Sequence, residues 1–240
     1  MKKFLFILFI LICAPAFASV AEGDAAYAAG NFTDALKQYE NALASEPGSA
    51  YLYYNIGNTY FKLDELGRAT AYYAKAFAIN PRDADIRYNL NFALSKSGQT
   101  LVPDGMPPAL HKAFFIMSGA ELKGLFFILL WLLCLAFAFY IFKRKGKRVV
   151  FTLAFAAVFV LCWYLAHYFA VDGMDAVTVA QVTQLRSGPE DTFEVTATLP
   201  EGYFVGLKDK KDDWVLAVNY KDGNMRGWAK KSNFISIRGL

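Results

Sequence analysis

Two long apolar segments, residues 125–142 and 149–171, constrain this chain more than any other feature of its sequence. Neither segment contains Asp, Glu, Lys or Arg. As helices they would be about 27 and 34 Å long, and the hydrocarbon core of a bilayer is about 30 Å thick. Neither segment has the polar face of a helix at the surface of a soluble domain. We therefore expect two transmembrane helices.

The loop between these segments, residues 143–148, indicates their orientation. It places five Lys or Arg side chains among six residues, and such loops stay cytoplasmic. The two helices then form a hairpin, and the soluble parts on both sides of it are exported. Residues 1–18 agree, because they combine Lys2 and Lys3, a short apolar run and the sequence Ala16-Phe17-Ala18. This pattern predicts a signal peptide cleaved after Ala18, and an uncleaved signal anchor would give the same orientation.

The composition fits a mixture of membrane helices and folded soluble modules. Hydrophobic residues make up 56% of the 240 residues and charged residues 19%, which is too apolar for one soluble domain and too polar for a polytopic transporter. The net charge of +4 falls to −3 without Lys2, Lys3 and the five cations of the loop. Nothing in this distribution indicates a nucleic-acid-binding surface.

Residues 20–97 repeat with a period of 34. The matching pairs are Gly23 and Gly57, Tyr27 and Phe61, Ala35 and Ala69, Tyr39 and Tyr73, Ala42 and Ala76, and Pro47 and Pro81. This pattern resembles the tetratricopeptide repeat, a helix-turn-helix unit of that length. We expect two repeats at 20–47 and 50–81 and a capping helix at 84–97. Because arrays of this kind need about three repeats for stability, we expect contacts with a partner or with the rest of its own chain to stabilise the module.

Such repeats bind extended segments in a concave groove lined by their first helices. The candidate peptide-binding residues at these positions are Tyr54, Asn55, Asn58, Lys62, Tyr88, Asn89 and Phe92. Asparagine suits this role because its amide both donates and accepts hydrogen bonds, as a peptide backbone does. The alternative is that Asn58 and Asn89 are ordinary polar positions and that the tyrosines only pack between helices.

Residues 98–124 form a connector rich in Gly and Pro at its start, which indicates a domain boundary. Its second part, residues 109–124, is either a helix lying in the membrane interface or the lead-in to the first span. The sequence leaves both readings open.

Residues 175–237 alternate apolar and polar side chains in short runs separated by turns, including a charged turn at 208–213. Five or six strands and a small barrel are expected. The segments Leu185-Arg186-Ser187-Gly188-Pro189, Leu199-Pro200-Glu201-Gly202, Trp214-Val215, Asp222-Gly223 and Gly227-Trp228-Ala229 resemble a bacterial SH3-like domain. The resemblance implies binding of peptides or cell-wall peptidoglycan. The candidate aromatic surface consists of Tyr203, Trp214, Tyr220 and Trp228, and the alternative is that both tryptophans belong to the barrel core.

Neither exported module contains the side chains of the common catalytic sites. The two histidines, His111 and His167, lie in the connector and in the second apolar segment, and the cysteines also lie outside both modules. This excludes Ser-His-Asp and Cys-His catalysis and Cys/His metal sites in the modules. We expect no catalytic residues, no cofactor and no metal.

The order of these parts resembles one bacterial family. A signal peptide, all-α tetratricopeptide repeats, a two-helix transmembrane hairpin and an all-β SH3-like barrel follow each other, and residues 85–90 read Asp-Ile-Arg-Tyr-Asn-Leu. This layout is similar to the BatE-type proteins of the Bacteroides aerotolerance (Bat) group. The resemblance implies a multidomain protein of the bacterial inner membrane, with both soluble modules in the periplasm. It also implies partners with von Willebrand A domains and an indirect link to oxygen or stress tolerance. The expected function is a membrane-anchored adaptor, and the alternatives are a peptidoglycan-binding sensor or anchor and an envelope assembly factor.

Overall fold

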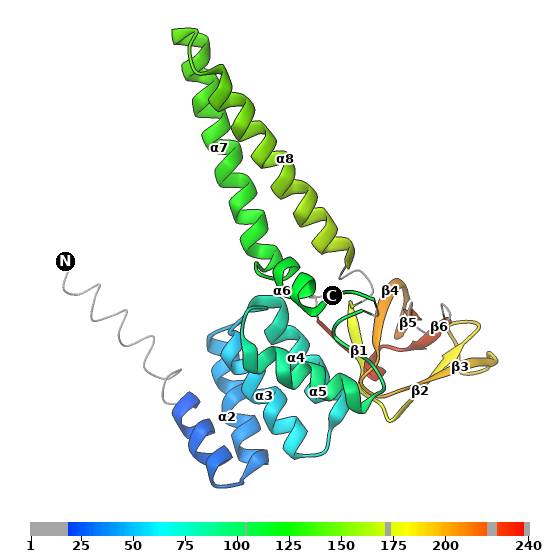
Figure 1. Ribbon diagram of the computed structural model, residues 1–240. Coiled ribbons are helices and arrows are strands. Elements are labelled where there is room, and N and C mark those ends of the chain that lie inside the picture. Colours follow the sequence, from blue (N-terminus) through cyan, green and yellow to red (C-terminus); the bar gives the residue numbers. More distant parts are fainter. Residues whose placement is uncertain (1–18, 104, 171–173, 220–224, 238–240) are drawn as a thin grey trace. The chain divides into compact units, whose positions relative to one another are not determined.

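The computed structural model describes residues 19–103, 105–170, 174–219 and 225–237 (Figure 1). The predicted signal peptide, residues 1–18, lies outside the described residues. The chain divides into two compact units. The first comprises residues 1–103 together with 173–240, and the second comprises residues 104–172.

The helices of the first unit repeat with the period found in the sequence. Residues 19–28 are helical, and they are followed by α2 (Phe32–Ser45), α3 (Ala50–Lys62), α4 (Leu66–Ile79) and α5 (Ala84–Lys96). The bounds of α2 and α4 differ by 34 residues at both ends, and so do those of α3 and α5. Successive helices contact each other and form the stack coloured blue to green in Figure 1. The predicted helical pairs are therefore present, and α5 follows as a single helix.

The turns inside the repeats share one backbone conformation. Gly30, Asp64 and Gly98 lie 34 residues apart, and their φ angles are +79°, +60° and +73°. Glycine adopts this left-handed conformation without a steric penalty, and Asp tolerates it better than most residues. The turn after α5 thus repeats the turns of the two full repeats, although the next helix, α6, begins only at Pro108 and belongs to the second unit.

Glycine allows the two helices of each repeat to approach closely. A Cβ atom built on Gly23 would lie 2.7 Å from Cε1 of Tyr39, and one built on Gly57 would lie 2.7 Å from Cδ1 of Tyr73. Real Cβ atoms do not approach other carbon atoms this closely, so each ring occupies the space that a side chain would need. Tyr39 and Tyr73 are buried, at 2% and 3% exposure.

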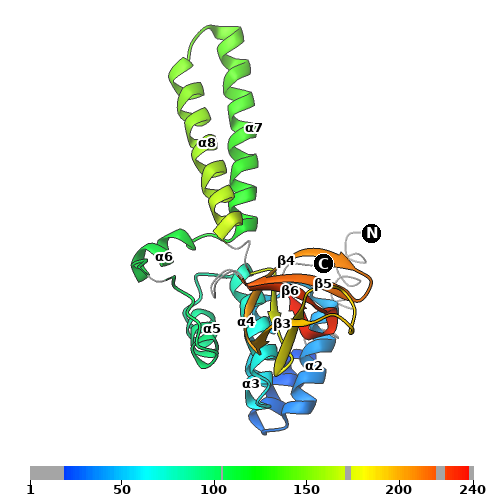
Figure 2. The same ribbon diagram turned by 90° about the vertical axis from the view of Figure 1, so that its right-hand side faces the viewer.

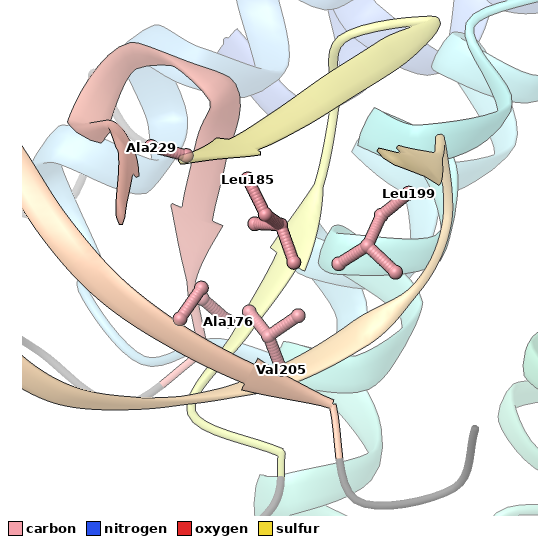
Figure 3. Packing of buried hydrophobic residues seen from close by; sticks show 6 residues of the cluster. Ala176, Leu185, Leu199, Val205 and Ala229 are labelled. Carbon is pink, nitrogen blue, oxygen red and sulfur yellow. The ribbon is translucent and has the colours of Figure 1, made fainter. Parts of the chain in front are cut away.

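The rest of the first unit is an antiparallel sheet with the strand order β3-β2-β6-β5-β4-β1-β7. Its strands are β1 (Ala176–Thr178), β2 (Val182–Arg186), β3 (Val195–Pro200), β4 (Phe204–Lys211), β5 (Trp214–Asn219), β6 (Met225–Lys230) and β7 (Phe234–Ser236). A 3₁₀ turn, η1 (Lys231–Asn233), joins the last two strands. The strands curve around a buried cluster (Figure 3), whose members are Ala176, Leu185, Leu199, Val205, Ala217 and Ala229.

One sequence prediction in this region is wrong. The charged segment 208–213 was expected to be a turn, but β4 continues to Lys211 and only Asp212 and Asp213 separate it from β5. Asp212 takes the left-handed conformation, with φ +51°. The side chains from Lys208 to Lys211 are exposed, so this end of the strand carries no apolar alternation that the sequence could reveal.

Within the first unit, the helices contact the sheet near the end of the repeats. The backbone N–H of Gly67 donates to Oε2 of Glu201 at 3.0 Å. Gln99, only 6% exposed, donates to the carbonyl of Gly202 at 2.8 Å and accepts from the N–H of Phe204 at 3.4 Å. The short helical module is therefore in contact with the sheet of its own chain.

The second unit contains α6 (Pro108–Phe114), α7 (Gly119–Lys143) and α8 (Lys147–Ala170). Helices α7 and α8 form an antiparallel hairpin that is visible in Figures 1 and 2. Both are long and apolar enough to cross a membrane, and only 0% and 11% of their most apolar windows are buried within the chain. A core helix of a soluble domain would bury most of its apolar surface.

Candidate functional site

The first helices of the repeats enclose an open pocket of 230 Å³. It is lined by Tyr27, Asn58, Phe61, Lys62, Tyr73, Tyr88, Asn89 and Phe92. Helices α3 and α5 supply six of these eight residues, because positions three or four residues apart on a helix lie on one face. Five of the seven predicted peptide-binding residues therefore meet at one pocket: Asn58, Lys62, Tyr88, Asn89 and Phe92. Tyr54 adjoins the pocket through Asn89, whereas Asn55 lies outside it.

Aromatic rings form one side of this pocket. Tyr88 and Phe92 are stacked, with ring centroids 6.4 Å apart and planes at 11°, and Phe61 meets Phe92 edge-on at 5.8 Å. Tyr88 is 70% exposed, so its ring is accessible to a ligand. Nζ of Lys96 lies 5.3 Å from the centroid of the Phe92 ring, which places a second cation near the rings besides Lys62.

Four polar side chains form a hydrogen-bonded network beside the rings. Asn89 donates through Nδ2 to the Tyr54 hydroxyl at 3.1 Å and to Oδ1 of Asn58 at 2.9 Å. The Tyr73 hydroxyl also donates to Oδ1 of Asn58, at 2.8 Å. These bonds hold both amides in fixed orientations, because rotation of either would break at least one bond.

Burial raises the pKa of several tyrosines in this module. Desolvation is the largest cause for Tyr73, Tyr39 and Tyr72, and it raises the pKa of Tyr72 to about 12. The hydrogen bond from Tyr39 to Asp24 raises the pKa of Tyr39 further, because the carboxylate disfavours a second negative charge. All three phenols are therefore protonated at neutral pH.

These shifts predict that stability falls in alkaline solution. A folded-state pKa above the unfolded value near 10 contributes stability that is complete below pH 10 and lost as pH rises through the folded pKa. For Tyr72 this loss occurs between pH 10 and about 12. Over that range the free energy of unfolding of the Tyr72→Phe variant should fall by about 2 kcal/mol less than that of the wild type. Urea unfolding at pH 9 and pH 12 measures this difference. Tyr88→Phe is the matched control at an exposed position, and equal losses in all three proteins would contradict the prediction.

Four residues near the pocket were missed from the sequence. Tyr27, Phe61 and Tyr73 were identified only as matching positions of the two repeats, yet they also line the pocket. Lys96 was not among the candidate peptide-binding residues. A signal for Lys96 was present, because it lies 34 residues after Lys62 and four after Phe92. For the three aromatic residues no signal was available. Rings that pack between the helices and rings that face the groove occupy similar positions in the repeat, so the sequence does not distinguish them.

The predicted aromatic surface of the sheet is present in part. The register of β5 and β6, in which Trp214 pairs with Lys230 and Leu216 with Trp228, places both tryptophans on the same face of the sheet. Trp214 lines an open pocket of 740 Å³ together with Asp191, Asp213, Lys230 and Lys231. Nζ of Lys230 lies 2.8 Å from Oδ2 of Asp191 and 5.6 Å from the centroid of the Trp214 ring.

Neither Trp228 nor Tyr203 lines this pocket. Tyr203 packs against the buried cluster of the sheet, and Trp228 pairs with Leu216 and Arg186 across the strands, outside this pocket. Tyr220 lies outside the described residues. Among the described residues, no group of three or more His, Cys, Asp or Glu side chains is placed to hold a metal ion.

Comparison with known proteins identifies the repeats. Residues 20–89 match the tetratricopeptide repeat family, which confirms that the chain contains such repeats. Two similar solved structures are the Arabidopsis OM64 TPR domain, at 19% identity and a TM-score of 0.34, and the first TPR of Spaghetti (RPAP3) bound to the HSP90 peptide SRMEEVD, at 22% and 0.33. Each covers 35% of this chain, and the match spans 70% of each of those chains. No curated protein sequence matches the chain.

Proposed function

We propose that this protein is a non-enzymatic, membrane-anchored scaffold that binds an extended segment of a partner protein in the pocket between α3 and α5. Tetratricopeptide repeats are a protein-interaction module, and the pocket carries the proposal. It combines accessible stacked rings, two oriented amides and nearby cations in one place.

The pocket favours a particular kind of segment. The internal bonds use Oδ1 of Asn58 and Nδ2 of Asn89, so a peptide backbone would meet the opposite half of each amide, a donor and an acceptor. The Tyr88 and Phe92 rings suit an apolar or aromatic side chain. Lys62 and Lys96 suit an acidic side chain next to it. We therefore propose an extended segment that carries an apolar residue beside an acidic one.

The hairpin α7–α8 is the proposed membrane anchor. Both helices satisfy the length and hydropathy of a membrane span, and the basic loop 143–148 favours a cytoplasmic turn with both modules on the periplasmic side. Anchoring raises the effective concentration of two partners held on one protein. The Bat group, the SH3-like assignment of the sheet and partners with von Willebrand A domains remain proposals that rest on the sequence resemblance.

A second candidate function rests on the pocket beside Trp214. A half-buried indole flanked by Asp191, Lys230 and Lys231 offers stacking and charged groups of both signs, which suits the zwitterionic peptides of peptidoglycan. In that case the protein is an envelope sensor or anchor, and the repeats are structural.

Selection of peptides tests the first proposal. Full-length protein in nanodiscs is used to select binders from a random peptide library displayed on phage, and the binders are measured against wild type, Asn89→Ala and Asn41→Ala. Asn89→Ala is expected to bind about fivefold more weakly, because one net hydrogen bond contributes about 1 kcal/mol. Asn41 is an exposed residue of α2, so its variant controls for the amide-to-methyl change. Equal affinities for all three proteins would contradict the proposal. Binding of purified peptidoglycan that only Trp214→Ala abolishes would favour the second candidate.

A further inference from the structure

The short helix α6 and the turn that follows it carry both buried and exposed apolar side chains. His111 and Phe115 are buried, at 3% and 7% exposure, whereas Leu110 and Ile116 are exposed, at 58% and 51%. Large apolar side chains exposed on a segment with a fixed packing partner indicate a surface that something else covers. Because α6 belongs to the same compact unit as the hairpin, its position relative to α7 and α8 is defined.

Specific contacts seat α6 and the residues after it against α8. The indole N–H of Trp163 donates to the carbonyl of Phe114 at 3.2 Å. The His167 ring stacks on Phe114, with centroids 5.5 Å apart, and meets Phe115 edge-on at 4.7 Å. His111 also packs on Phe115, with ring centroids 4.7 Å apart. These rings give the two histidines a packing role at the end of the hairpin remote from the basic loop (Figures 1 and 2).

The level of these contacts along α8 matches the border of a membrane. Starting from Val149, the first residue after the basic loop, a hydrocarbon core of about 30 Å takes about 20 helical residues and ends near Tyr168. Counting back from Phe142 along α7 places the same border near Lys123. Trp163 and His167 therefore lie within about two turns of the border, and interfacial helices lie about 5–10 Å into this layer.

The charge of the segment also fits a lipid surface. Residues 105–118 contain one formally charged side chain, Lys112, and no acidic residue. Lys112 is exposed and can reach phosphate groups while its neighbours remain in the apolar layer. Trp163 and Tyr168 are aromatic types that concentrate at membrane interfaces.

We infer that α6 is an interfacial helix, and that its Leu110 and Ile116 in the turn after it insert among phospholipids at the exported border of the hairpin. The inference rests on the proposed membrane anchoring and deepens it. It resolves the two readings of the connector: α6 (Pro108–Phe114) is a separate helix in the interface, and α7 begins only at Gly119.

Spin labels on the full-length protein in phospholipid liposomes test this inference. Single cysteines are introduced as Leu110→Cys, Ile116→Cys and Lys112→Cys after Cys13, Cys134 and Cys162 are replaced by Ala. All three positions are exposed, so the labels leave the packing intact. Collision rates with oxygen, which enriches in lipid, and with a water-soluble nickel complex give a depth parameter. We expect a positive shift of this parameter at 110 and 116 relative to 112.

Phe155→Cys, at an exposed position in the middle of α8, separates this inference from the anchoring proposal. A lipid signal at 155 with water-like signals at 110 and 116 would overturn the interfacial helix and leave the span intact. Low collision rates with both reagents at 110 and 116 would show that a second protein copy covers this face, which also overturns the inference. A water-like signal at 155 would instead contradict the membrane span itself.

Discussion

Replacing Gly57 by leucine is expected to destabilise the repeats by about 3 kcal/mol, with a loss of order in α3 and α4. A Cβ atom at this position already lies 2.7 Å from Cδ1 and 2.8 Å from Cε1 of Tyr73. The ring has little room to move, because it is buried and its hydroxyl is bonded to Asn58. The larger leucine side chain must therefore separate the two helices or expel the ring.

Hydrogen exchange measured by mass spectrometry on the full-length protein locates the damage. We expect faster exchange in α3 and α4, and a loss of peptide binding, because Tyr73 and Asn58 both line the pocket. A double-mutant cycle provides the control: Gly57→Ala combined with Tyr73→Leu should cost less than the sum of the single changes, since the smaller side chain vacates part of the contested space. Additive costs would show that the two positions are independent and would contradict this account of the helix contact.

The helices could be predicted from the sequence because their pattern is local and repeated. Six pairs of residues at an offset of 34 located the helical pairs. The two apolar segments were visible for the same reason, although α7 begins at Gly119, six residues before the predicted start. Its first turn is closed by Ser118 and Glu121, which bond each other's backbone N–H groups, and the apolar criterion does not detect this polar capping box.

The remaining features depend on contacts between distant residues. Glu201 and Gly67 are 134 positions apart, and nothing in the local sequence of either residue indicates the other. The pocket was predicted in part, because first helices face the groove by definition of the repeat. The position of Tyr203 against the buried cluster of the sheet could not be predicted, since alternation along a strand assigns a face but not the curvature of the sheet.

Replacing Gly67 by alanine is expected to detach the sheet from the repeats. In an open helix this substitution stabilises by about 1 kcal/mol. Here the added Cβ would lie 2.6 Å from the carbonyl oxygen of Thr178 and 2.9 Å from Cα of Val179. Both atoms belong to backbone, which cannot rotate away as a flexible side chain would. We therefore expect a net loss of about 2–3 kcal/mol and breakage of the hydrogen bonds that join Gln99 to Gly202 and Phe204.

The site of this damage distinguishes it from that of the Gly57 variant. Exchange should accelerate at the N–H of Phe204 and in residues 97–101, while the contact between α3 and α4 stays protected, because Tyr73 and Gly57 are untouched. Gly124→Ala is the matched control: Gly124 also lies in a helix, α7, but nothing lies within 4 Å of its added Cβ. If Gly67→Ala leaves the exchange of Phe204 unchanged, the sheet does not support the repeats. In that case the two repeats and α5 are stable alone, or a partner protein stabilises them.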